Sequence, residues 1–152
     1  MKGRVVIFLI QAAVLIGCSR PVSSENFVRI EDKGVDGRYH FAIDMTDSLC
    51  TYDVYFYSRI DCGSAKLAQI RDFPMMVTWV SPSGQKFEER VYFDVHAETD
   101  DSGYYSKNFK ILYRSGLVPV SPGEWEMQVR IDSDRYVPGF RGLGVICKKN
   151  LD

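Results

Sequence analysis

The sequence predicts an all-β protein, an antiparallel β-sandwich of about seven to eight strands in an Ig-like or jelly-roll-like arrangement, preceded by a lipoprotein signal peptide. Apolar and polar residues alternate with a period of two along most of the chain after residue 38, which is the pattern of half-buried strands. Aromatic residues make up 13% of the chain, with nine Tyr and nine Phe, and such residues favour strands. Turn sequences containing Pro and Gly separate the alternating runs, as is typical of a sandwich.

The first eighteen residues have the features of a secretory signal. Lys2 and Arg4 give a basic start, and residues 5–16 are apolar except for Gln11. This run is shorter than the roughly 20 residues that a membrane-spanning helix needs. Leu15-Ile16-Gly17-Cys18 resembles a lipobox, although an ordinary signal that happens to contain a cysteine is the alternative. The resemblance implies cleavage before Cys18, acylation of that residue and a membrane as a partner through the lipid anchor.

The segment after Cys18 is polar and has no hydrophobic period, so it predicts a flexible tether. The expected organisation is a signal peptide over residues 1–17, a lipidated tether over 18–26 and a β-sandwich domain over 27–152. By resemblance to lipoproteins of the phylum with gliding motility, a short acidic patch just after the lipidated cysteine would imply export to the cell surface. Ser19, Arg20 and Pro21 stand there instead. We therefore expect the periplasmic face of the bacterial outer membrane.

The charge balance argues against a nucleic-acid partner. Removal of Lys2 and Arg4 with the signal leaves 17 basic against 20 acidic residues, a net charge of −3. A nucleic-acid footprint needs a clustered basic face, and the sequence has none.

Three cysteines remain if Cys18 is acylated, namely Cys50, Cys62 and Cys147. In an oxidising compartment they allow one disulfide among them, and the sequence leaves the pair open. A bridge from Cys50 to Cys62 would require the chain to turn back, because an extended strand between them would hold the ends too far apart. Paired CxxC spacing is absent, so no zinc site is predicted.

The first half of the domain contains four expected strands. Alternation predicts strands over 39–44 and 50–60, and Ala-Lys-Leu-Ala-Gln favours a short helix around 64–70. Residues 73–81 and 86–95 flank the turn Ser81-Pro82-Ser83-Gly84 and predict a hairpin.

The second half predicts strands over 104–114 and 124–132, with a turn at Val120-Ser121-Pro122-Gly123. Trp125, Met127 and Val129 should face the core. A last strand covers 143–147, and its glycines at 139–144 indicate a bulged or tightly packed edge strand.

Several tyrosines fall on faces expected to be exposed. Tyr55, Tyr57, Tyr92, Tyr104 and Tyr105 could form a flat stacking surface for sugar rings. The alternative is ordinary cross-strand packing, which also favours Tyr.

No catalytic constellation is predicted, and no cofactor or metal is expected. His40 and His96 are isolated, and no G-x-S-x-G sequence is present. Asp94, Glu98 and Asp100 belong to an acidic loop without EF-hand spacing, so we expect a solvated loop and not a calcium site.

The order of these pieces resembles the gliding-motility lipoproteins called GldH. The resemblance runs from Cys18 through the Pro82-Ser83-Gly84 turn to Pro122-Gly123-Glu124-Trp125 and Gly142-Leu143-Gly144-Val145. It implies a membrane-anchored, non-catalytic accessory of the gliding or protein-secretion machinery, with other cell-envelope proteins as partners. A glycan-binding envelope lipoprotein with an exposed aromatic face is the alternative.

Overall fold

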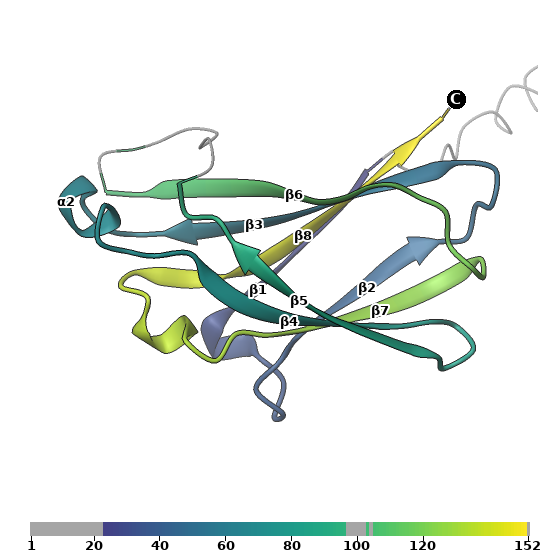
Figure 1. Ribbon diagram of the computed structural model, residues 1–152, viewed down its shortest axis with the longest axis horizontal. Helices are drawn as coiled ribbons and strands as arrows, with labels where there is room; N and C mark the ends of the chain where they lie inside the picture. The colour runs from purple at the N-terminus through teal and green to yellow at the C-terminus, as the bar shows by residue number, and fades with distance from the viewer. Residues whose placement is uncertain (1–22, 97–102, 104, 152) are drawn as a thin grey trace, which may run out of the picture.

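The computed structural model describes residues 23–96, 103 and 105–151, which form two four-stranded antiparallel sheets packed together (Figure 1). The first sheet has the order β1-β8-β3-β6, with bounds Ser23–Arg29, Phe140–Asn150, Thr51–Ile60 and Lys107–Leu117. The second has the order β2-β7-β4-β5, with bounds Tyr39–Met45, Gly123–Arg130, Phe73–Val80 and Lys86–Phe93. The predicted all-β sandwich is confirmed.

Helical structure is limited to short segments between strands. The predicted short helix is present as α2, Ser64–Leu67, and two 3-10 turns lie at η2, Ile30–Asp32, and η3, Asp134–Tyr136. Within the described part of the chain, every helix is too short to cross a membrane.

The core forms where the predicted alternation turns one face of each strand inward. In β7, Trp125, Met127 and Val129 are buried while the residues between them are exposed or half-buried. In β2, Tyr39, Phe41 and Ile43 are buried opposite them. Full burial of such a side chain contributes about 1.5–3 kcal/mol, so the buried side chains of β2 and β7 stabilise the packing of the second sheet against the first.

The domain begins earlier than the sequence indicates. Ser23–Arg29 forms strand β1 and pairs with β8, from Ser23 opposite Lys148 to Arg29 opposite Gly142. Residues 23–26 were expected to belong to the tether, and the boundary at residue 27 is wrong. The reason is physical: β1 is held by its pairing with β8 and keeps most of its side chains in solvent, so it lacks the hydrophobic period of a strand.

The disulfide that the sequence allows is not formed, and Cys50, Cys62 and Cys147 are buried free thiols. Strand β3 separates Cys50 from Cys62 over ten extended residues, which span about 33 Å at ~3.3 Å each. This span exceeds the ~7 Å limit between bridged α-carbons, so Cys50 and Cys62 cannot be bridged. Cys147 lies opposite Val54 of β3.

The glycine-rich strand β8 is central and not at an edge, because β1 and β3 pair with its two sides. The tight packing expected of it is present. A Cβ at Gly144 would lie 2.1 Å from Cε1 of Tyr57, and one at Gly142 would lie 2.2 Å from the carbonyl oxygen of Val28. Glycine therefore lets the Tyr57 ring and the β1 backbone approach β8 closely.

The two ends of the sandwich differ in what they hold. We call the end with Ser23 and Leu151 the proximal end; it also carries the connections 46–50, 81–85 and 118–122 (right side of Figure 1). The distal end carries α2, η2, η3 and the turn at 34–37.

Candidate functional site

An apolar cleft lies between the edges of the two sheets. Strand β6 is an edge of the first sheet and β5 an edge of the second, and the cleft of about 230 Å³ draws residues from both. Its lining residues are Met45, Trp79, Phe87, Glu89, Arg114, Leu117, Val118, Pro119, Val120 and Trp125.

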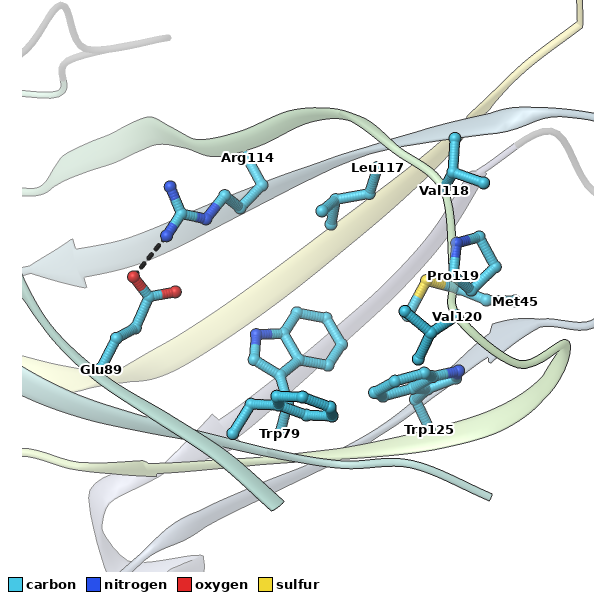
Figure 2. A pocket seen from close by; sticks show the side chains of 10 residues that line it. Met45, Trp79, Glu89, Arg114, Leu117, Val118, Pro119, Val120 and Trp125 are labelled. Atoms are coloured by element: carbon cyan, nitrogen blue, oxygen red, sulfur yellow. Dashed lines mark hydrogen bonds and ion pairs between the residues drawn. The ribbon is translucent and has the colours of Figure 1, made fainter. Parts of the chain in front are cut away.

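Two tryptophans form the floor of the cleft (Figure 2). Trp79 on β4 and Trp125 on β7 are buried, with ring centroids 6.1 Å apart in an edge-to-face arrangement. Trp125 Nε1 donates to the carbonyl oxygen of Ser121 at 2.9 Å, which ties the floor to the β6–β7 connection. Phe87 on β5 lies 6.1 Å from the Trp125 ring and is 47% exposed, so an apolar side chain borders the opening.

A polar cluster closes the end of the cleft opposite the β6–β7 connection. The Tyr113 hydroxyl accepts from Trp79 Nε1 at 2.9 Å and donates to the Glu89 carboxylate. Arg114 forms an ion pair with Glu89, so β6 and β5 are joined across the gap (Figure 2). We call Trp79, Tyr113, Glu89 and Arg114 the edge clasp.

A β-bulge in β6 builds the edge clasp. Leu112 lies opposite Tyr55 and Arg114 opposite Val54, so Tyr113 is the extra residue. Regular alternation along 109–114 would turn Arg114 to the face opposite Tyr113, and the bulge overrides this alternation. As a result both side chains reach Glu89.

Burial and a carboxylate partner keep Tyr113 of the clasp protonated. Burial, followed by the hydrogen bond to Glu89, raises the pKa of Tyr113 above its usual range. The phenol therefore keeps its proton and stays a donor to the carboxylate at neutral pH. The cleft thus offers an apolar floor for an aliphatic or aromatic group and a charged pair at one end.

The predicted tyrosine surface is not assembled. Tyr55 and Tyr57 lie on the outer face of the first sheet, whereas Tyr92 lies on the outer face of the second. Tyr105 is exposed before β6, and Tyr104 lies outside the described residues.

The rings of Tyr55 and Tyr57 already have partners. Lys110 Nζ lies 4.6 Å from the Tyr55 ring centroid, and Phe27 packs on Tyr57 at 5.6 Å. Burial and the hydrogen bond to Glu25 raise the pKa of Tyr57 above its usual range. For these two tyrosines the cross-strand packing alternative holds.

His40 lies between two carboxylates on the outer face of the second sheet. Its Nδ1 is 2.9 Å from Glu126 Oε1 and its Nε2 is 3.1 Å from Asp36 Oδ1. The hydrogen bond to Glu126, then that to Asp36, raises the pKa of His40. Because both ring nitrogens bind carboxylates, His40 stabilises a local network and leaves neither nitrogen for a third group.

The acidic loop lies mostly at residues 97–102, outside the described residues. Its described beginning is a turn in which the backbone N–H of His96 donates to Asp94 at 2.7 Å. Across 23–96, 103 and 105–151, His, Cys, Asp and Glu do not gather into a group of three that could hold a metal ion.

A second groove, lined by both polar and apolar residues, lies at the distal end, with a volume of about 530 Å³. Its polar lining includes Lys66, Gln69, Arg71 and Asp72, and the exposed ring of Tyr136 borders it.

Sequence reasoning missed the apolar cleft, although one signal for it was present. Glu89 falls in the alternating run of Phe87, Val91 and Phe93, where an inward-facing acid is out of place. An inward charge on a strand is a device of sheet edges, and the structure places β5 at an edge. Trp125 is buried as predicted, and both it and the buried Trp79 also floor the cleft.

Together the fold and the site define a β-sandwich protein with an apolar cleft between two edge strands. No family model matches the sequence, and no curated protein matches it. A solved protein from Sulfurospirillum deleyianum is similar at 9% identity over 87% of this chain and 99% of that chain, with a TM-score of 0.41. The Yersinia pseudotuberculosis-derived mitogen is similar at 9% identity over 85% of this chain and 90% of that chain, with a TM-score of 0.24. At these scores neither likeness bears on function.

Proposed function

We propose that this protein is a lipid-anchored interaction protein of the bacterial cell envelope, which holds a partner protein in its apolar cleft and performs no catalysis. The observation that carries the proposal is the cleft itself: two tryptophans floor it, and unpaired edges of β5 and β6 flank it. The anchor rests on the lipobox resemblance at Cys18, and the lack of an acidic patch at residues 19–21 is the basis for proposing the periplasmic face of the outer membrane.

The partner fits as an extended segment with an apolar side chain. An extended chain adds to a sheet edge through main-chain hydrogen bonds, and pockets for alternate side chains supply specificity. Here β5 or β6 supplies the edge and the space above Trp79 and Trp125 supplies the pocket. The Glu89–Arg114 pair at one end offers charged groups that can orient the segment.

Photo-crosslinking in intact cells tests this proposal. A benzoylphenylalanine at position 87, which borders the cleft, should give a discrete crosslinked envelope protein. Position 92 is the matched control because it lies on the same strand but on the outer face of the sheet. Equal crosslinking at both positions, or none at position 87, would contradict the proposal.

A charge placed in the cleft provides a second test. Leu117→Glu puts a carboxylate against the tryptophan floor and should abolish the crosslink from position 87. Leu112→Glu on the same strand is the control, because Leu112 is exposed on the outer face of the first sheet. Loss of the crosslink in both variants would point to general damage and not to the cleft.

We further propose that the partner belongs to the gliding or protein-secretion machinery, as the GldH resemblance implies. Deletion of the gene should then impair colony spreading or secretion, and a Cys18→Ala protein should fail to restore it. A crosslinked partner from an unrelated process, with spreading and secretion intact, would reject this assignment while leaving the interaction role in place.

Glycan binding is the second candidate, and the mixed lining of the distal groove favours it. Sugar sites combine an aromatic face with planar polar side chains, and Tyr136, Gln69 and Arg71 meet this description. A glycan array should then show binding that Tyr136→Ala removes and Tyr92→Ala preserves. A blank array would reject it.

A further inference from the structure

The exposed aliphatic side chains at the proximal end come from three separate segments of the chain. Leu49 is 94% exposed, Val118 65%, Val120 75% and Leu151 68%. They belong to the β2–β3 connection, the β6–β7 connection and the C-terminal residues after β8, which all lie at the end of the sandwich that holds Ser23 (Figure 1).

The same end is the one closest to the proposed lipid anchor. Four residues separate Cys18 from Ser23, the first residue of β1. A chain spans at most about 3.6 Å per residue, so Ser23 lies within about 18 Å of the acylated cysteine. Strand β1 then runs away from that point for seven residues, about 23 Å at ~3.3 Å each.

We propose that Leu49, Val118, Val120 and Leu151 contact the headgroup–acyl boundary of a phospholipid bilayer, so that the sandwich stands on its proximal end. This inference rests on the proposed anchor at Cys18. Aliphatic side chains are stabilised at this boundary because it removes apolar surface from water. A tether this short keeps the proximal end beside the membrane, so the contact forms at a high effective concentration.

Charges at the proximal end indicate which lipid surface suits it. Lys149 forms an ion pair with Asp47, and Asp53 accepts from the backbone N–H of Gly116 at 2.8 Å. Exposed Lys148 and Glu124 add charges of both signs. The attraction is therefore apolar, and it should persist on zwitterionic phospholipid and at high salt.

This orientation also places the apolar cleft near the bilayer. Val118 and Val120 line the cleft and belong to the contacting surface. A partner would therefore enter the cleft close to the bilayer surface, and not at the membrane-distant end of the sandwich.

Site-directed fluorescence on the acylated full-length product tests the orientation. Leu49→Cys and Leu151→Cys are each labelled with an environment-sensitive maleimide dye and reconstituted into phosphatidylcholine vesicles. The described native cysteines are buried, so the dye reacts at the new site. Val35→Cys is the control, because Val35 is fully exposed at the distal end. Vesicle flotation is scored first, and dye quenching by aqueous iodide is then measured.

We expect quenching at positions 49 and 151 to fall at least about twofold on reconstitution, as for side chains held at the interface, with no change at position 35. The result should be the same at low and high salt. If the protein floats but all three positions stay equally quenched, the orientation is wrong and the anchor stands. If the full-length product without a dye carries no acyl group and does not float, the anchor is wrong and the orientation falls with it.

Discussion

Tyr113→Phe tests the edge clasp. The substitution keeps the ring that packs on Phe56 at 4.7 Å and removes only the hydroxyl, so no cavity opens in the core. Trp79 Nε1 then loses its acceptor at 2.9 Å, and Trp79 is only 9% exposed. A buried donor left without a partner costs about 1–3 kcal/mol, so the free energy of unfolding should fall by that amount.

Urea unfolding of residues 19–152 measures this loss. For a slope of about 2 kcal/mol per molar urea, the midpoint should drop by roughly 0.5–1.5 M. Circular dichroism is the better probe, because both tryptophans of the chain lie in the cleft and their emission responds to the substitution itself. Tyr92→Phe is the control, since Tyr92 lies exposed on the outer face and should change stability by less than about 0.5 kcal/mol. Equal stability of the two variants would refute the clasp as a stabilising link.

Three further predictions concern groups outside the cleft. Asp134→Ala removes a buried carboxylate that binds Lys33 at 2.7 Å, and the unpaired Lys33 should cost about 3–5 kcal/mol in urea unfolding; a loss below about 1 kcal/mol would contradict the pair. Burial raises the pKa of Cys147 to about 11, so a thiol reagent at pH 8 should react slowly with folded residues 19–152. After unfolding without reductant, the reagent should titrate three thiols; a count of one would show that a disulfide is present after all. The hydrogen bonds to Glu126 and Asp36 stabilise protonated His40 in the folded state and so raise its pKa. Their contribution to the free energy of unfolding is fully present below the unfolded pKa of 6.5 and is lost as pH rises through the folded pKa. The stability advantage of wild type over His40→Gln should therefore be greater at pH 5.5 than at pH 8.5, and an advantage independent of pH would reject this.

The parts of the fold that were predicted from sequence are those that local pattern controls. Strands β2 and β7 bury alternate residues because each has one face on the core, so their periodicity is visible in the sequence. Strand β1 was missed because its polar side chains stay in solvent and only the backbone of β8 makes it a strand. Whether a disulfide could join Cys50 and Cys62 depended on whether the chain turns back between them, and β3 stays extended there.

The cleft required long-range information. Its existence depends on which strands end each sheet, and β5 and β6 become edges only through the pairings of β4 and β3 with other strands. Its polar end depends on a bulge that turns Arg114 from the outward position that alternation predicts. The inward-facing Glu89 was the one local hint, because an acid among Phe87 and Val91 needs a partner across the sheet edge.

The pairing of β1 with β8 determines how the domain responds to a force applied at its first described residue, Ser23. A force on Ser23 directed along β1 acts parallel to the strand, so the seven residue pairs from Ser23↔Lys148 to Arg29↔Gly142 resist it together, in shear. The same bonds pulled sideways would open one after another. If the proposed anchor at Cys18 exists, tension transmitted through it along β1 would enter the domain in its mechanically stronger direction.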